Sequence, residues 1–323
     1  MAADGPARSD GPAPSKDGNA GAAERILREV AGDRVRRAFP LARLTSFRLG
    51  GPAALYLEAG SQEDLSAVGR ALRETGLPFL VIGKGSNLLV SDGGFPGLVL
   101  RLGRAFRWAA RDGDRITAGG AMPLPALAGV ALAHSLAGLE FGVAIPASLG
   151  GSVRMNAGAH GRSLDEVLES AEVFLAEEDR LSVVLVEEAG FRYRDSTLPE
   201  RSVVIGATVR LHPGDPSEIR ALMDEARQWR RATQPLAEPN CGSVFKNPPG
   251  DHAARLVEAA GAKGLAVGGA VVSEKHANFI VAREGATARD VHLLIALVRD
   301  RVHERFGVRL EPEVHLVGEF DEP

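Results

Sequence analysis

The segment Val81–Asn87, with the sequence Val-Ile-Gly-Lys-Gly-Ser-Asn, constrains the fold of this chain more than any other segment. An apolar strand that runs directly into Gly-Lys-Gly-Ser-Asn exposes successive backbone N–H groups, which can hold a phosphate or pyrophosphate. The segment lacks the third glycine and the following helix of a Rossmann motif, and no Ser or Thr follows Lys84 as in a P-loop. A tight hairpin, for which Gly and Asn are the usual residues, is the alternative.

A second glycine-rich segment, Ile145–Ala159, reads Ile-Pro-Ala-Ser-Leu-Gly-Gly-Ser-Val-Arg-Met-Asn-Ala-Gly-Ala. Gly150 and Gly151 have no Cβ, so the backbone there can approach a flat or phosphorylated ligand closely. The side-chain amide of Asn156 supplies both a hydrogen-bond donor and an acceptor. A helix-entry loop would explain the proline and the first serine of this segment, but not the Asn-Ala-Gly that follows.

Hydrophobic periodicity predicts an α+β protein, and the length of 323 residues predicts roughly two domains, or three small ones. Residues 1–22, rich in Ala, Gly, Pro, Asp and Ser, are expected to form a disordered tail. Three blocks are predicted to follow, at residues 23–102, 103–213 and 214–323. Helices are predicted at 23–39, 61–75, 123–134, 216–231, 251–260 and 288–306. Strands are predicted at 53–58, 79–82, 88–90, 98–102, 106–110, 115–118, 167–176, 181–186, 203–211, 277–281 and 313–317.

Charge and cysteine content exclude several classes of protein. The 38 Lys and Arg nearly balance 42 Asp and Glu, which argues against a strongly basic nucleic-acid binder. Cys241 is the one cysteine, so no internal disulfide or cysteine-rich metal site is expected, and no His-Glu-x-x-His motif occurs. The longest uncharged stretch, residues 116–139, contains two prolines and several glycines and is predicted to be a strand end, a turn and a buried helix. We therefore expect a cytoplasmic protein with no metal, membrane or nucleic-acid partner.

Lysine is rare in this chain. There are five lysines against 33 arginines, and four of the five lie inside Gly-, Asn- or His-containing segments: Lys84, Lys246, Lys263 and Lys275. Because the lysine ammonium is a compact charge that suits phosphate, this distribution suggests an anionic, phosphorylated ligand.

Three further polar residues are candidates for chemistry. Arg194 can hold a carboxylate with two hydrogen bonds, or it can pair with the adjacent Asp195 on the surface. Ser243 lies in a Gly-Ser turn but lacks the Gly-x-Ser-x-Gly context of a hydrolase nucleophile. Glu313 opens the last predicted strand, where a single glutamate is usually solvated. Cys241 is interpreted as a small packing residue.

Taken together, these motifs resemble the UDP-N-acetylenolpyruvoylglucosamine reductases of peptidoglycan synthesis. The resemblance runs in order from about residue 23 to 318, which makes it far more specific than any single motif. The matching segments are 45–51 (TSFRLGG), 83–87 (GKGSN), 145–151 (IPASLGG), 156–158 (NAG), 193–196 (YRDS), 242–248 (GSVFKNP), 268–278 (GGAVVSEKHAN) and 313–314 (EV).

The resemblance implies the FAD-binding fold of the vanillyl-alcohol-oxidase/PCMH type. The blocks at 23–102 and 103–213 would hold FAD, and the block at 214–323 would bind the substrate, a UDP-sugar. NADPH would reduce the flavin and leave, and the flavin would then pass hydride to the terminal enol carbon, giving UDP-N-acetylmuramate. The residues that the resemblance assigns to FAD are Gly83, Lys84, Gly85, Ser86, Asn87, Ile145, Pro146, Gly150, Gly151, Asn156, Ala157 and Gly158.

The resemblance also implies roles at the reacting centre. Hydride addition pushes negative charge into the enolpyruvyl carboxylate, and Arg194 matches the residue that stabilises this charge. Ser243 matches the proton donor to the neighbouring carbon, and Glu313 matches the third active-site residue. The residues at substrate-contacting places are Gln234, Asn247 and His276.

One departure concerns a loop that closes over the substrate with a tyrosine in some members. Ser243 follows Arg194 by only 49 positions, so the chain resembles the shorter, loop-less type. Separately, we expect a monomer. Two other functions remain open at this point. One is a different FAD-dependent oxidoreductase of the same fold, acting on hydroxy acids or sugars, and the other is a nucleotide-binding module without catalysis.

Overall fold

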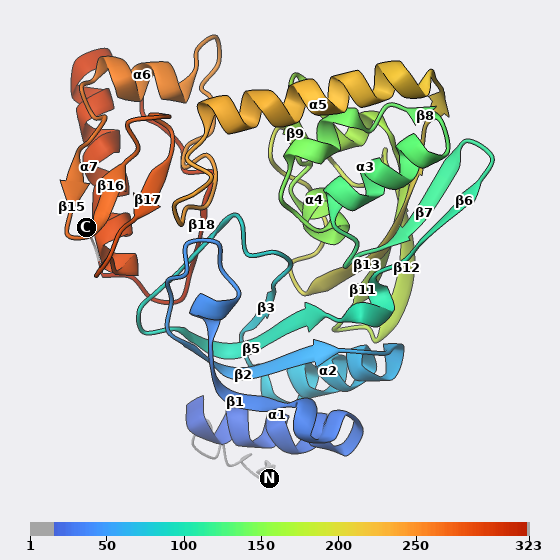
Figure 1. Cartoon of the computed structure of the whole chain (residues 1–323). Helices are drawn as coiled ribbons and strands as arrows, with labels where there is room; N and C mark the ends of the chain where they lie inside the picture. The colour runs from blue at the N-terminus through green and yellow to red at the C-terminus, as the bar shows by residue number, and fades with distance from the viewer. Residues whose placement is uncertain (1–15, 322–323) are drawn as a thin grey trace, which may run out of the picture.

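The computed structural model describes residues 16–321, which form three lobes around a common centre (Figure 1). The first lobe runs from α1 to β5, the second from β6 to α5, and the third from α6 to β18. Each lobe has its own apolar core, and the long helix α5 runs from the second lobe towards the third (Figure 1).

The first lobe is a four-stranded sheet of order β1-β2-β5-β3 with two helices on one face (Figure 1). Its elements are α1 (Lys16–Ala31), β1 (Arg36–Pro40), β2 (Pro52–Ala59), α2 (Gln62–Thr75), β3 (Phe79–Val81), β4 (Leu88–Val90) and β5 (Phe95–Leu102). Ser61 caps α2, its hydroxyl accepting a hydrogen bond from the Asp64 N–H at 3.3 Å. The helix ends at Gly76, whose φ of 62° lies in the left-handed region.

The start of the chain differs from the prediction in two ways. Residues 16–22 are helical rather than disordered, because the small side chains of Ala20 and Ala23 are buried in the first core; residues 1–15 lie outside the described part of the chain. The helix then stops at Ala31 instead of continuing to residue 39, and Arg36–Pro40 forms a strand paired antiparallel with β2. A positive φ of 54° at Gly32 accompanies this break.

The second lobe is an antiparallel sheet of order β12-β11-β13-β7-β6 with helices on one face. Its elements are β6 (Ala109–Asp112), β7 (Arg115–Gly119), α3 (Leu124–Ala133), β8 (Leu136–Ala137), α4 (Leu149–Arg154), β9 (Gly158–Ala159), β10 (Arg162–Ser163), β11 (Leu168–Leu175), β12 (Arg180–Leu185), β13 (Ser202–Arg210), β14 (His212–Pro213) and α5 (Pro216–Thr233). Ile219, Met223 and Ala226 of α5 belong to the core of this lobe. These contacts attach α5 to the second lobe, whereas the predicted boundary after residue 213 places it in the third block.

The third lobe contains a three-stranded antiparallel sheet and two helices. Its elements are α6 (Ala253–Ala259), β15 (Ala266–Val267), β16 (Ala270–Val272), β17 (Ile280–Ala282), α7 (Ala288–Phe306) and β18 (His315–Val317). A capping box between Thr287 and Asp290 starts α7, and Gly307, at a φ of 68°, ends it. After α7 the chain leaves the lobe, because β18 pairs in parallel with β4 of the first lobe. That return carries Glu313 to the centre of the molecule.

The uncharged stretch 116–139 folds, as predicted, into the end of β7, a turn and the helix α3. Over residues 16–321, no helix combines the length and the apolar character that crossing a bilayer requires. The same residues contain no group of three or more His, Cys, Asp or Glu side chains arranged to hold a metal ion.

Candidate active site

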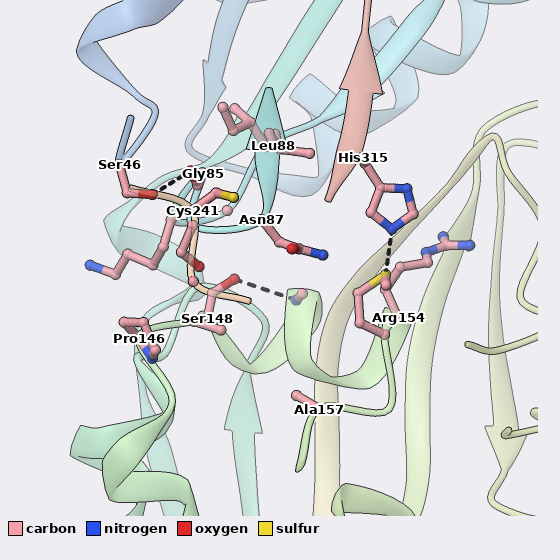
Figure 2. A pocket seen from close by; sticks show the side chains of 18 of the residues that line it. Ser46, Gly85, Asn87, Leu88, Pro146, Ser148, Arg154, Ala157, Cys241 and His315 are labelled. Carbon is pink, nitrogen blue, oxygen red and sulfur yellow. Dashed lines mark hydrogen bonds between the residues drawn. The ribbon is translucent and has the colours of Figure 1, made fainter. Parts of the chain in front are cut away.

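A cavity of about 1320 Å³ lies where the three lobes meet, and we call it the central cavity. Both glycine-rich segments, the Arg194 loop, the loop after α5 and the start of β18 line it. Figure 2 shows part of this wall, with Gly85 and Asn87 on one side and Pro146, Ser148 and Ala157 on the other. Single-ligand pockets usually measure about 300–1,000 Å³, so the central cavity has room for a large cofactor and a second ligand.

The first glycine-rich segment, Gly83–Asn87, crosses from one sheet to another. It follows β3, which pairs with β5, and precedes β4, which pairs with β18, so the hairpin alternative is wrong. Gly85 has a φ of 59°, and an added Cβ would lie 2.0 Å from the carbonyl oxygen of Leu44. The backbone N–H groups of Lys84, Gly85 and Ser86 have no acceptor among residues 16–321. They are therefore available to an anionic ligand.

The second glycine-rich segment contains α4, a short helix that the sequence did not predict. Ser148 caps it, its hydroxyl accepting a hydrogen bond from the N–H of Gly151 at 3.4 Å (Figure 2). A Cβ on Gly83 would lie 2.4 Å from that same hydroxyl oxygen, so the two glycine-rich segments touch. The predicted residues of this segment that line the cavity are Ile145, Pro146, Gly150, Gly151, Ala157 and Gly158.

Asn156 is the one predicted FAD residue that does not line the central cavity. It is 3% exposed, and its amide is engaged with the backbone of Arg192 and of Asp165. Its polar side chain suggested a ligand contact, but the amide instead satisfies backbone groups of two neighbouring loops.

Arg194 and Glu313 meet at the wall of the cavity although 119 positions separate them. The Nε of Arg194 donates to the Glu313 carboxylate at 3.0 Å, and an Nη donates to the Gly158 carbonyl at 2.7 Å. Both side chains are less than one-fifth exposed. Burial raises the pKa of the Glu313 carboxyl, and the Arg194 guanidinium opposes part of that rise. The alternative pairing of Arg194 with Asp195 on the surface is not observed.

Ser243 lines the cavity from the loop that joins α5 to α6. Its segment is held on two sides: the Glu313 N–H donates to the Val244 carbonyl at 2.7 Å, and the Val244 N–H donates to the Asn278 carbonyl at 2.9 Å. The side-chain amide of Asn87 donates to the Glu313 carbonyl at 3.0 Å, which links the first glycine-rich segment to this wall. Cys241 is buried, and burial raises the pKa of its thiol, so it remains a protonated packing residue.

The three predicted substrate residues are placed differently. Gln234 lines the cavity, and its side-chain oxygen accepts a hydrogen bond from Arg230 Nε at 2.9 Å. Asn247 and His276 do not line it. Asn247 is exposed and accepts from the N–H of Ala253 at the start of α6, whereas His276 packs edge-on against Phe279.

Several arginines outside the predicted site residues give the cavity a positive lining. The basic residues that line the cavity are Arg48, Lys84, Arg101, Arg104, Arg107, Arg154, Arg194 and Arg230, against the carboxylates Glu58, Asp195, Glu200, Glu238 and Glu313. Their clustering depends on the tertiary fold, so no local signal in the sequence could have found it.

The lysine distribution is a weaker indicator than we expected. Only Lys84 lines the cavity. Lys246 pairs with Glu311 and Lys263 with Glu258, while Lys275 donates to the Arg231 carbonyl at 2.6 Å.

Two family models match the chain. Residues 53–183, which span the first and second lobes, match an FAD-binding domain. Residues 234–317 match the C-terminal domain of UDP-N-acetylenolpyruvoylglucosamine reductase, and this match begins directly after α5. The predicted α+β FAD-binding fold with a separate C-terminal domain is thereby confirmed.

Whole-chain relatives agree with these matches. UDP-N-acetylenolpyruvoylglucosamine reductase of Anaeromyxobacter dehalogenans is 47% identical over 92% of this chain and 89% of its own length. The second such reductase of Symbiobacterium thermophilum is 48% identical over 90% of this chain and 96% of its own length. The crystal structure of the reductase from Thermus caldophilus superimposes with a TM-score of 0.77 at 36% identity, covering 88% of this chain and 99% of that one. The chain belongs to the UDP-N-acetylenolpyruvoylglucosamine reductase family.

Proposed function

We propose that this chain reduces UDP-N-acetylenolpyruvoylglucosamine to UDP-N-acetylmuramate in peptidoglycan precursor synthesis, with NADPH as the reductant and FAD as the bound cofactor. The observation that carries this proposal is the convergence of Arg194, Ser243 and Glu313, from three separate elements, on the cavity that both glycine-rich segments line. The first two lobes would hold the cofactor, and the third lobe would supply most of the substrate site.

The residues present fit FAD. The free backbone N–H groups of Lys84, Gly85 and Ser86 would hold the FAD pyrophosphate. The glycines of the segment from Ile145 to Gly158 have no Cβ, so the backbone of this segment would lie close against the rest of the FAD. When bound, FAD would supply the carrier that accepts a hydride (two electrons and one proton) from NADPH and passes it to the substrate.

Arg194 would bind the carboxylate of the enolpyruvyl group. A guanidinium that is four-fifths buried acts in a low-dielectric environment, where it stabilises developing negative charge more strongly than in water. The backbone bond to Gly158 and the ion pair with Glu313 fix its direction before the substrate arrives. Glu313 would lie beside the same carboxylate, and burial raises the pKa of its carboxyl although the Arg194 guanidinium opposes the rise.

Ser243 would give its hydroxyl proton to the substrate carbon next to the carboxylate. A hydroxyl is a weak acid, but it suffices because a carbanion-like centre is a strong base.

We propose that the chain is of the shorter type, without a tyrosine loop over the substrate. Between Arg194 and Ser243 the chain forms β13, β14 and α5 and a short connection. The chain contains two tyrosines: Tyr56 is buried in the first lobe, and Tyr193 lies beside Arg194, whose guanidinium is 4.9 Å from the ring centroid.

Steady-state consumption of NADPH tests the proposed reaction. The purified protein should be yellow from bound FAD, and loss of NADPH should depend on added UDP-N-acetylenolpyruvoylglucosamine. A protein that instead oxidises hydroxy acids or sugars, and leaves NADPH unchanged when this substrate is added, would be the other type of FAD enzyme considered above.

Replacing Arg230 by alanine should raise the KM for the UDP-sugar by about 10-fold or more, with a smaller change in kcat. Its guanidinium faces the cavity, has no carboxylate partner among the described residues, and has its pKa lowered by burial, so an anionic group such as a diphosphate would stabilise it. Arg231→Ala is the matched control, because the neighbouring Arg231 side chain is exposed and does not line the cavity. An equal rise of KM in both variants would rule out this role.

A further inference from the structure

Two buried asparagines hold the loops that carry Arg194 and Ser243. Asn156 is 3% exposed and Asn278 is 4% exposed, and neither side chain lines the central cavity. Burying a primary amide costs free energy unless its donor and acceptor are both used. Both side-chain partners of Asn278 are on Phe245, two residues after Ser243, and one of the two partners of Asn156 is on Arg192, two residues before Arg194.

Asn278 makes a two-point contact with one residue. Its Oδ1 accepts from the Phe245 N–H at 2.9 Å, and its Nδ2 donates to the Phe245 carbonyl at 2.8 Å. Its own carbonyl accepts from the Val244 N–H at 2.9 Å. Three hydrogen bonds therefore fix the backbone immediately after Ser243.

Asn156 makes the corresponding contacts at the turn that carries Arg194. Its Nδ2 donates to the Arg192 carbonyl at 3.2 Å, and its Oδ1 accepts from the Asp165 N–H at 3.1 Å. Arg192 and Asp195 close a tight turn by two backbone hydrogen bonds of 3.1 and 3.2 Å, and Arg194 sits within this turn at a φ of 59°. Asn156 therefore anchors the turn at its first residue.

We propose that Asn278 positions the Ser243 hydroxyl and that Asn156 positions the Arg194 guanidinium, each acting through its own loop and not on the substrate. Removing the Asn278 amide would leave buried backbone groups of Phe245 unpaired, and removing the Asn156 amide would leave part-buried ones of Arg192 and Asp165 unpaired. In each case the loop would shift to find water or other partners. A displacement of about 1 Å at a reacting group can slow a reaction by about 100-fold. This inference rests on the roles proposed above for Ser243 and Arg194.

Double-mutant cycles test the proposal, because residues that act as a unit give non-additive losses. The FAD-bound protein is reduced by NADPH without oxygen and mixed with UDP-N-acetylenolpyruvoylglucosamine, and the rate of flavin reoxidation is measured. Asn278→Ala alone should slow this rate by about 10- to 100-fold. In the Ser243→Ala background, Asn278→Ala should cause no further slowing. In the Arg194→Lys background, it should slow reoxidation by the same factor as it does alone.

Asn156→Ala should show the crossed pattern. Combined with Ser243→Ala, it should slow flavin reoxidation by the same factor as it does alone. Combined with Arg194→Lys, it should cause little further slowing. Reduction by NADPH and the content of bound FAD should stay within about twofold of the parent protein in both single variants. If an alanine variant does not accumulate as folded protein, Asn278→Asp or Asn156→Asp replaces it in the same cycles, because each keeps the size and the acceptor oxygen and puts a second, ionisable oxygen in place of the donor.

If the fold-losses multiply in all four double variants, the asparagines have a general structural role and the proposal is overturned. Single variants that react at the parent rate would also overturn it. Failure of the parent protein itself to be reoxidised by this substrate would instead contradict the proposed function.

Discussion

Replacing Ser243 by alanine should slow reoxidation of the reduced protein by UDP-N-acetylenolpyruvoylglucosamine by about 10²–10⁴-fold, the usual contribution of a positioned proton donor. Reduction of the bound flavin by NADPH should change little, because that step needs no proton from this hydroxyl. Rapid mixing without oxygen separates the two half-reactions, since the flavin absorbance falls in the first and returns in the second.

The first half-reaction serves as the internal control for folding and for cofactor binding in this variant. Equal slowing of both half-reactions would contradict the proton-donor role, because it would indicate a general disturbance of the cavity. An unchanged second half-reaction would contradict it directly.

Replacing Arg194 by lysine should lower kcat by about 10²–10³-fold, which is typical when one donor to developing charge is lost. Lysine keeps the positive charge but not the planar fork that donates to Glu313 and Gly158 together. Steady-state rates at saturating substrate measure the effect, and a loss confined to KM would show that Arg194 contributes to binding alone.

Arg194→Ala adds a test through pH. The Arg194 guanidinium lowers the pKa of Glu313 against the larger raising effect of burial. Without the guanidinium the pKa of Glu313 should rise further, so the limb of the pH–rate profile that reports this carboxyl should move to higher pH. A limb that moves to lower pH, or stays in place, would show that the two groups do not interact in the working enzyme.

Local signals in the sequence predict the regular elements of this fold well. The helix α7 has the predicted bounds, because Thr287 and Gly307 mark its two ends with residues that favour a cap and a left-handed turn. By contrast, α4 spans only six residues, too few for an apolar periodicity to appear. The assignment of α5 to the second lobe depends on which core its apolar face meets, and periodicity alone cannot specify that.

In the candidate site, too, the sequence predicts one part and tertiary packing decides the other. The family resemblance leads us to expect Arg194, Ser243, Glu313 and the predicted FAD residues of the glycine-rich segments around one site, and all of them line the central cavity except Asn156. It could not give the direction of each polar side chain: Ser243 lines the cavity, whereas Asn247, four positions later, accepts a hydrogen bond from the first N–H of α6. A motif records which residues occur together, but only tertiary packing decides which of them face a ligand and which satisfy backbone groups, as Asn156 does.

The central claim is that one cavity carries NADPH-dependent reduction of an enolpyruvyl UDP-sugar, and a single anaerobic turnover tests it most directly. FAD-bound protein is reduced with NADPH, separated from the nicotinamide nucleotide and mixed with UDP-N-acetylenolpyruvoylglucosamine. The flavin absorbance at about 450 nm and the amount of product are then followed together. The account predicts that the band returns and that one UDP-N-acetylmuramate forms for each flavin reoxidised. A flavin that stays reduced in the presence of this substrate, or that is reoxidised without forming UDP-N-acetylmuramate, would contradict it.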